Sequence, residues 1–351
     1  METMAQIKAR LHAMPRVSLG FYPTPLHRLE TVSREHQVNV YIKREDFSGI
    51  SLFGGNKVRK LEYVLGSAKE QGCDTVVTYG ATQSNHAMET ATAARRCGMH
   101  PVLFLVSLVA QQEEIRANLL LDTILGAEVH IFSALPGESM DDVFVRCQPQ
   151  IDARISELTK EGHQVYDIPS GASNEIGILG YADAFVEIME QLGAMGIHPD
   201  AIFTATGTGG TLAGLAAGKA LTKETVDLIG VQVSPKNQDA YKKEISDLAN
   251  GALDKIGAKE RVTPELFSCD GRYYMPGYEI PNPAANDDIR YLARTEGLFS
   301  DPVYSGKAFH GMMECIRNGE IPKNSNVVFL HTGGTTALFS EPEIVGDLTK
   351  K

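Results

Sequence analysis

The chain of 351 residues has few cysteines, no long hydrophobic run and a shortage of positive charge. Its five cysteines, at positions 73, 97, 147, 269 and 315, form no CxxC pair, which favours reduced thiols over a disulfide framework and offers no cysteine-based metal site. The longest apolar stretch, residues 101–110, is far shorter than the roughly 20 residues of a membrane-spanning helix. The N-terminus also lacks the apolar segment of a signal peptide. We therefore expect a cytoplasmic protein that does not associate with membranes.

The charge balance and the length narrow the classes of protein further. The chain has 44 acidic against 33 basic residues, a formal net charge of -11, which repels phosphate backbones. Nucleic acid is therefore not an expected partner. The histidines at 86, 100, 310 and 331 stand singly, without metal-ligand spacing, so no metal site is predicted. The length favours two domains.

Helical and β-branched segments alternate along most of the chain, which predicts an α/β fold with parallel sheets flanked by helices. The predicted strands span residues 75–79, 102–106, 128–132, 164–168, 201–205, 228–233 and 326–331. Helical patterns separate them at residues 87–96, 115–125, 140–159, 178–192, after 210, 287–296 and 307–317. Residues 275–283 are rich in proline, glycine and asparagine, which is typical of a loop. The charged run 43–46 is interpreted as a solvated or ion-paired strand end.

Two segments could carry chemistry, although each also has a simpler interpretation. In Gly54-Gly55-Asn56-Lys57 a lysine opens a helix, where the positive end of the helix dipole disfavours its charge. It is either a solvated lysine or a Schiff-base lysine whose amine is made available. In residues 80–86 (GATQSNH) a polar turn follows a strand and opens a helix, which suits either an ordinary N-cap or an anion site.

A third segment, residues 206–214 (TGTGGTLAG), has enough glycine for backbone amides to surround a phosphate at a helix start. It fails the dinucleotide fingerprint because Leu212 replaces the third glycine, and it lacks the GK[ST] of a nucleotide P-loop. A monophosphate without ribose remains. Together with the lysine and the carboxylate-type turn, this predicts pyridoxal 5'-phosphate (PLP) acting on an amino acid.

The combination of GGNKxRKLE, QSNH, TGTGGTLAG, PGYxxPN, DPVYxGK and HTGG resembles the 1-aminocyclopropane-1-carboxylate (ACC) deaminase and D-cysteine desulfhydrase family of tryptophan-synthase β-like, fold type II PLP enzymes. The resemblance runs from about residue 22 to 338. It implies a large PLP-binding domain of residues 1–60 and 168–351, with a small α/β domain of residues 61–167 between them. It also implies a homodimer that acts on a small amino acid.

The resemblance further implies a role for individual residues. Those expected to bind the cofactor are Lys57 as the Schiff-base lysine, Asn85 at the 3'-oxygen, the phosphate-binding Gly207, Thr208, Gly209, Gly210 and Thr211, and Thr332. Those expected at the substrate are Gln83, Ser84, Asn85 and Tyr278. The catalytic set is Lys57, Ser84, Tyr278 and Tyr304, with Lys57 or Ser84 removing the α-proton and a tyrosine assisting the leaving group.

One departure from the deaminase pattern bears on the reaction. After DPVY, ACC deaminases carry a glutamate that pairs with the pyridine nitrogen, whereas this chain has Ser305, and its HTGG segment has Thr332 as in desulfhydrase-like members. A hydroxyl makes the ring a weaker electron sink than a carboxylate does. This favours D-cysteine desulfhydrase-like β-elimination, giving pyruvate, ammonia and sulfide. L-cysteate sulfo-lyase, ACC deaminase and a PLP-carrier protein without turnover remain open alternatives.

Overall fold

The computed structural model describes residues 2–49, 54–108 and 115–340. The end of the apolar stretch, residues 109–110, and the last residues of the predicted large domain lie outside that part of the chain. The strands are β1 (Leu26–Arg28), β2 (Asn39–Arg44), β3 (Thr75–Ala81), β4 (His100–Ser107), β5 (Glu128–Ser133), β6 (Val165–Ile168), β7 (Ala201–Thr206), β8 (Asp227–Gln232), β9 (Ser268–Asp270) and β10 (Asn326–His331).

The helices confirm the predicted alternation and add elements that the sequence pattern missed. They are α1 (Met4–His12), α2 (Glu30–His36), α3 (Lys57–Glu70), α4 (Asn85–Arg96), α5 (Ala117–Ile124), α6 (Met140–Lys160), α7 (Leu179–Ala194), α8 (Gly210–Thr222), α9 (Gln238–Lys255), α10 (Pro283–Glu296) and α11 (Ser305–Arg317). Short 3-10 turns span Glu45–Phe47, Ser170–Ala172, Pro264–Leu266 and Thr335–Phe339. Helices α1, α2 and α9 and strands β1 and β9 were not predicted.

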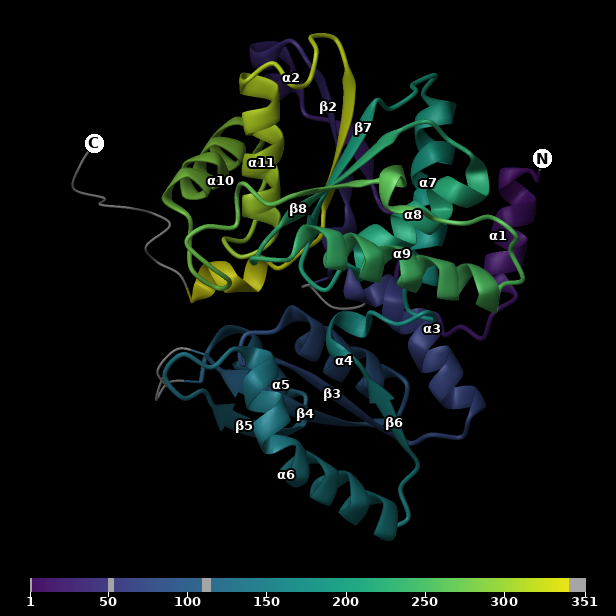
Figure 1. Cartoon of the computed structure of the whole chain (residues 1–351), viewed down its shortest axis with the longest axis vertical. Coiled ribbons are helices and arrows are strands. Elements are labelled where there is room, and N and C mark those ends of the chain that lie inside the picture. The colour runs from purple at the N-terminus through teal and green to yellow at the C-terminus, as the bar shows by residue number, and fades with distance from the viewer. Residues whose placement is uncertain (1, 50–53, 109–114, 341–351) are drawn as a thin grey trace.

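The strands form two sheets, one in the upper and one in the lower part of Figure 1. The larger has the order β1-β2-β10-β7-β8-β9 and is parallel except for β1. The smaller, β5-β4-β3-β6, is parallel throughout. Parallel strands need crossover connections, which the helices supply. The fold is therefore the α/β class with helix-flanked parallel sheets that the sequence predicted.

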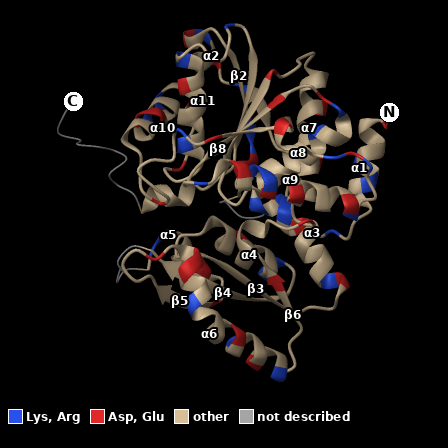
Figure 2. Ribbon diagram, viewed as in Figure 1, with Lys and Arg blue, Asp and Glu red and all other residues tan. Residues whose placement is uncertain are grey.

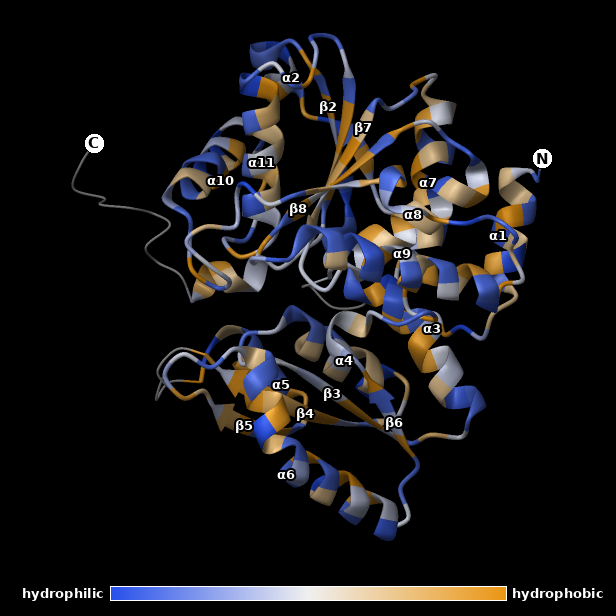
Figure 3. Cartoon of the chain, viewed as in Figure 1, coloured by the Kyte–Doolittle hydropathy of each residue, from blue (hydrophilic) through white to orange (hydrophobic). Residues whose placement is uncertain are grey.

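Alternating side chains give the large sheet two buried faces. Ile202 and Val328 point into the core shared with α7, α8 and α9, while the neighbouring Phe203 and Phe329 point into the core shared with α11. Its central strands are accordingly among the most hydrophobic segments in Figure 3, as expected for a sheet covered on both faces. The small sheet packs α4 and α5 on one face and α6 on the other.

Helix α3 lies between the two sheets (Figure 1) and contributes to both. Leu61 and Leu65 pack with Val76 of β3 and Ala93 of α4 in the core of the small sheet. On another side of α3, the backbone of Arg59 approaches Gly180 of α7 so closely that a Cβ there would lie 2.3 Å from the Arg59 carbonyl oxygen. The helix that begins at the candidate lysine is thus held from both directions.

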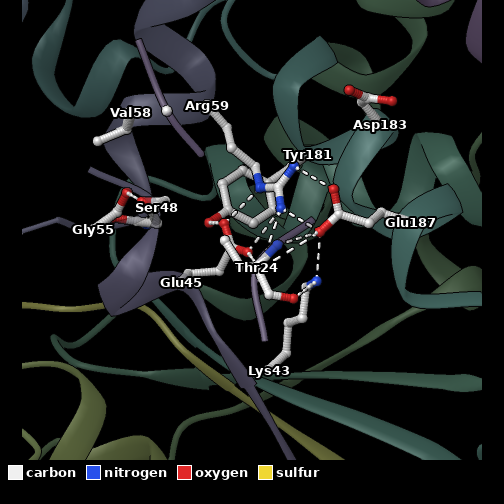
Figure 4. A network of polar contacts seen from close by, with 12 residues as sticks. Thr24, Lys43, Glu45, Ser48, Gly55, Val58, Arg59, Tyr181, Asp183 and Glu187 are labelled. Carbon is white, nitrogen blue, oxygen red and sulfur yellow. Dashed lines mark hydrogen bonds and ion pairs between the residues drawn. The ribbon is translucent and has the colours of Figure 1, made fainter. Parts of the chain in front are cut away.

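Charged residues are distributed over both parts of the molecule (Figure 2), and some of them are buried. The run 43–46 is ion-paired, as one interpretation held, but its Lys43 and Glu45 are not solvated, because both have no exposed surface. Arg59 donates to Glu45 at 2.6 Å and to Glu187 at 2.7 Å, and Lys43 donates to Glu187 (Figure 4). The Tyr181 hydroxyl donates to Glu45 at 3.1 Å. This buried network ties α3 to β2 and α7.

No helix in the described part of the chain is both long enough and apolar enough to cross a membrane. All five cysteines are free thiols.

We expect Glu187→Ala to lower the free energy of unfolding by about 3–5 kcal/mol, because it leaves Lys43 and Arg59 buried without a shared counter-charge. Glu190→Gln on the same helix is the control, since Glu190 pairs with Lys8 at the surface, where ion pairs contribute about 1 kcal/mol or less. Denaturant titration of both variants measures the difference. Equal stability of the two variants would contradict the role of the network.

The same network predicts a dependence of stability on acid. Burial alone would raise the pKa of Glu187, but the charges of Arg59 and Lys43 outweigh it and lower the pKa from 4.5 to about 2. A depressed carboxyl pKa stabilises the folded state above the unfolded value of 4.5, and that contribution is lost as the pH falls through 2. Unfolding measured across this window should show the loss in the native chain and a smaller loss in Glu187→Gln.

Candidate active site

Apart from the two tyrosines, the predicted site residues lie on segments that follow the carboxyl ends of β3, β7 and β10 and on the start of α3. Hydrogen bonds join these segments: the Asn56 amide donates to the Thr332 carbonyl at 3.0 Å, and the Asn56 side chain donates to Thr211 Oγ1 at 2.9 Å. A Cβ added at Gly334 would lie 2.9 Å from Asn85 Nδ2. The ends of parallel strands are where α/β proteins bind ligands. Segments from four regions of the sequence therefore meet at one place.

Lys57 is the first residue of α3, and its side chain is only partly exposed. Its Nζ donates to Asn56 Oδ1 at 2.7 Å. Burial lowers the pKa of Lys57, while the nearby charges of Glu89 and Asp301 oppose that change. A lysine whose ammonium is destabilised supplies a neutral amine more readily than a solvated one. The surroundings of Lys57 thus favour the interpretation as a reactive amine.

The glycine-rich turn wraps the start of α8. Gly209 has a φ of +81° and precedes the first helical residue, Gly210, so the first backbone amides of the helix are turned outward at its positive end. Thr208 Oγ1 contacts Ser173 Oγ at 2.7 Å, which fixes the turn from the opposite side. A residue with a side chain at 209 would be strained by its φ, and its Cβ would lie 2.7 Å from Ile245.

Lys60 is a functional candidate that the sequence reasoning missed. The turn itself has no cationic side chain, but the buried Lys60 lies behind it: Nζ donates to the Gly171 carbonyl at 3.1 Å, and a Cβ at Gly210 would lie 2.7 Å from Nζ. Burial and the charge of Lys57 lower its pKa well below the usual range. The spacing of three residues from Lys57, which puts both on neighbouring faces of one helix, was the available signal.

The turn after β3 provides the N-cap of α4, which was the simpler interpretation, and it is also compatible with an anion site. Ser84 is the N-cap of α4, with Oγ accepting the Ala87 amide at 3.2 Å, so its hydroxyl hydrogen can still be donated. Asn85 Oδ1 accepts from Asn118 at 2.8 Å. Gln83 is bound at both ends of its amide, to the Asn118 amide at 3.0 Å and the Arg116 carbonyl at 3.2 Å. Its side chain therefore braces the turn.

The two predicted tyrosines are brought together from separate segments. The hydroxyls of Tyr278 and Tyr304 are hydrogen-bonded, and their ring centroids lie 5.9 Å apart. Burial raises the pKa of both hydroxyls above the usual value, so both are protonated at neutral pH. Lys307 supports this pair by donating to the Gly277 carbonyl at 2.7 Å, next to Tyr278. A protonated pair can offer a hydrogen bond to a leaving group and a proton once that group develops negative charge.

The hydroxyls of Ser305 and Thr332, which have equivalent roles in the sequence prediction, have different surroundings in the structure. The Ser305 hydroxyl is buried and donates to Asp301 Oδ1 at 2.5 Å, whereas the Thr332 hydroxyl has no hydrogen-bond partner among the described residues. Asp301 also accepts the amides of residues 303, 304 and 305 at 2.7–2.9 Å. Asp301 thus binds the amides at the start of α11 and the Ser305 hydroxyl, and of the two hydroxyls Thr332 is the one that remains available.

No cluster of three or more histidine, cysteine or acidic side chains in residues 2–49, 54–108 and 115–340 could hold a metal ion.

Residues 17–333 match the family described as pyridoxal-phosphate dependent enzyme. The chain belongs to this family, and its cofactor is pyridoxal 5'-phosphate. The residues present fit that group: a lysine whose charged form is destabilised by burial, a glycine turn at a helix start backed by the buried Lys60, and the Thr332 hydroxyl, which no other described side chain or backbone group binds.

Within the family, the chain is similar to ACC deaminases and to D-cysteine desulfhydrase. A Thermotoga maritima protein whose name includes 1-aminocyclopropane-1-carboxylate deaminase is 39% identical over 93% of this chain and 98% of its own. The D-cysteine desulfhydrase of Serratia proteamaculans is 34% identical over 95% of this chain and 98% of its own. A crystal structure of an ACC deaminase homologue is 36% identical, with a TM-score of 0.85 over 98% of this chain and 99% of that one.

We expect Gly209→Val to reduce cofactor retention on dialysis by at least tenfold, because the strained φ and the contact with Ile245 displace the amides at the start of α8. Gly193→Val is the control, since a Cβ there meets no atom within 4 Å and its φ is ordinary. Circular dichroism establishes that both variants are folded. Retention equal to that of the native chain in a folded Gly209→Val protein would refute the assignment of the phosphate turn.

Proposed function

We propose that the chain catalyses PLP-dependent β-elimination on a small amino acid with a sulfur-type leaving group, in the manner of D-cysteine desulfhydrase. Cysteine and water would give pyruvate, ammonia and sulfide. The observation that carries the proposal is the polar group available near the cofactor residues, which is the hydroxyl of Thr332 and not a carboxylate. The two buried carboxylates whose charges act on Lys57 are already engaged. Asp301 accepts four hydrogen bonds at the start of α11, and Glu89 accepts the backbone amides of Lys57 and Val58.

The residues of the site divide the chemical work. PLP, when bound, supplies an electron sink for the pair left at the substrate α-carbon. Lys57 or Ser84 takes the α-proton, and the free amides at the start of α4 suit the substrate carboxylate. The C–S bond breaks with its electron pair leaving on sulfur, and the Tyr278–Tyr304 pair donates a proton to that sulfur. Hydrolysis of the released enamine gives pyruvate and ammonia.

Opening a cyclopropane places a heavier demand on the electron sink, because no stable anion leaves. For that reason a hydroxyl at the pyridine nitrogen favours sulfide as the leaving group. ACC deamination is nevertheless a second candidate, supported by the names of relatives that are 39% and 34% identical to this chain. L-cysteate sulfo-lyase activity would use the same residues, with sulfite in place of sulfide.

Further features of the organisation belong to the same proposal. The strands of the small sheet all fall within residues 75–168, which supports a small domain of residues 61–167 inside a large one of residues 1–60 and 168–351. A cytoplasmic location is supported by the five free cysteines. A homodimer is what the resemblance to the family implies.

The test is the release of keto acid from D-cysteine, L-cysteine, L-cysteate, D-serine, 3-chloro-D-alanine and ACC. We expect turnover of D-cysteine or cysteate to exceed that of ACC by more than about a hundredfold, the equivalent of one charge-assisted contact of roughly 3 kcal/mol. Lys57→Ala should lose both turnover and the visible absorption of the lysine-bound cofactor. Preference of the native chain for ACC would overturn the proposal.

Thr332 provides a sharper test of the same idea. Thr332→Val keeps the shape of the side chain and removes its hydroxyl, and should slow elimination about tenfold, the equivalent of one neutral hydrogen bond. Thr332→Ser keeps the hydroxyl and should retain most of the rate. Cofactor content, measured by absorbance, should be unchanged in both. Equal rates for the valine and serine variants would show that the hydroxyl takes no part.

A further inference from the structure

We propose that Glu89 is a positioning residue that holds the start of α3 in place and sets the protonation of Lys57. The inference deepens the proposed function, on which it rests for the role of Lys57. Glu89 lies on α4, outside the motifs that suggested the site, and is buried. Its carboxylate Oε2 accepts the backbone amides of Lys57 and Val58, both at 3.1 Å.

Glu89 supplies the hydrogen-bond acceptor for the first amides of α3, a role that a residue at the start of the helix usually fills. The first turn of α3 has no acidic residue, and the side chain of the N-cap Asn56 forms no capping hydrogen bond, because it is directed to Lys57 Nζ and Thr211. The first amides of a helix need acceptors when they are buried. The carboxylate of a neighbouring helix supplies them, so the backbone of Lys57 is bonded directly to Glu89.

The turn before Lys57 is packed tightly against this carboxylate. A Cβ at Gly55 would lie 2.4 Å from Glu89 Oε1 and 3.1 Å from the Thr332 carbonyl. The Gly55 carbonyl accepts from Ser48 at 2.8 Å. The Glu89 carboxylate therefore lies directly against the turn that leads into α3 and against the backbone from which the Lys57 side chain starts.

The charge of Glu89 matters because the surroundings of Lys57 are otherwise unfavourable to a cation. Burial and the positive end of α3 both disfavour an ammonium at Lys57. Burial raises the pKa of Glu89 to about 7, while the charge of Lys57 and the two amides act to lower it. Among the described residues, the other titratable groups that interact with the pair are Lys60, Asp301 and His86. Burial together with the charges of Lys57 and Lys60 lowers the pKa of His86 well below its usual range.

Asp301 does not replace Glu89 in this role. It acts on Lys57 through its charge, but its oxygens accept four hydrogen bonds from the start of α11. Glu89 is the acidic side chain that bonds the backbone of Lys57 itself. Near neutral pH the ionisation of Glu89 therefore decides how readily Lys57 holds a proton.

The experiment measures the pKa of Lys57 in the full chain after the cofactor is removed. An amine-acylating reagent is applied across a range of pH, and the modified Lys57 peptide is quantified by mass spectrometry, with the exposed Lys243 as internal reference. Glu89→Gln keeps an oxygen acceptor for the two amides but loses the charge. We expect it to lower the pKa of Lys57 by about one unit, a tenfold change in the ionisation constant.

Glu62→Gln is the matched control. Glu62 is a buried acid on α3 that accepts two backbone amides, those of Leu19 and Gly20 at 2.9 Å, and it is not among the charges that act on Lys57. It should leave the pKa of Lys57 unchanged. Gly55→Ala is a second test, because its Cβ displaces the Glu89 carboxylate without removing it, and it should shift the pKa in the same direction as Glu89→Gln.

An unchanged Lys57 pKa in folded Glu89→Gln protein overturns the proposal, as does a shift of equal size in Glu62→Gln. If Glu89→Gln does not fold, the Gly55→Ala result decides in the same way. The labelling needs no bound cofactor, so it remains informative if Lys57 is not the cofactor lysine. That separate failure would appear as visible absorption that survives in Lys57→Ala.

Discussion

The structure depends on the burial of positive charge at the start of one helix. The first turn of α3 carries Lys57, Arg59 and Lys60, and burial acts on all three. An uncompensated buried charge costs several kcal/mol, so each cation requires a partner from elsewhere in the chain. Arg59 has Glu45 and Glu187, while Lys60 has a backbone carbonyl. The charges of Glu89 and Asp301 only partly offset the effect of burial on Lys57, so its pKa stays lowered, as a reactive amine requires.

The distribution of these charges along α3 links the buried ion-pair network to the candidate site. The bidentate contacts of Arg59 anchor α3 to the large sheet and to α7, and two residues earlier the same turn presents Lys57 to the site. Charge-assisted bonds of this kind are geometrically specific. The anchoring residue Arg59 and the proposed cofactor lysine Lys57 therefore lie in the same turn of α3.

Much of the fold and part of the site could be predicted because the signals are local. Strands such as β3 and β7 are short β-branched runs, and the glycine turn before α8 has few other uses. Lys57, Ser84 and Thr332 came from motifs that are continuous in sequence. Their meeting at one place followed from the rule for strand ends.

The residues that were missed owe their roles to partners far away in the chain. Glu89 looks like any acid on a helix, and only its distance to the amide of Lys57, 32 residues earlier, gives it a role. The run 43–46 has the composition of an exposed segment because it is rich in charged residues. Its Lys43 is buried because it pairs with Glu187, which is far away in the sequence. Sequence patterns carry no information about such pairings. For Ser305, the position in the motif suggested a contact with the cofactor, and only the structure shows that its hydroxyl donates to Asp301.

The pairing of β2 with β10 joins residues 39–44 to residues 326–331, nearly the full length of the chain apart. During synthesis on a ribosome, the small sheet of residues 75–168 can form as soon as its own strands have emerged, because all its pairings lie within that range. The large sheet has to wait for its central strand β10, which is made after the other five strands of that sheet. Thr332 follows that strand directly, so the segments that meet at the candidate site come together only after all the other strands of the large sheet have been made.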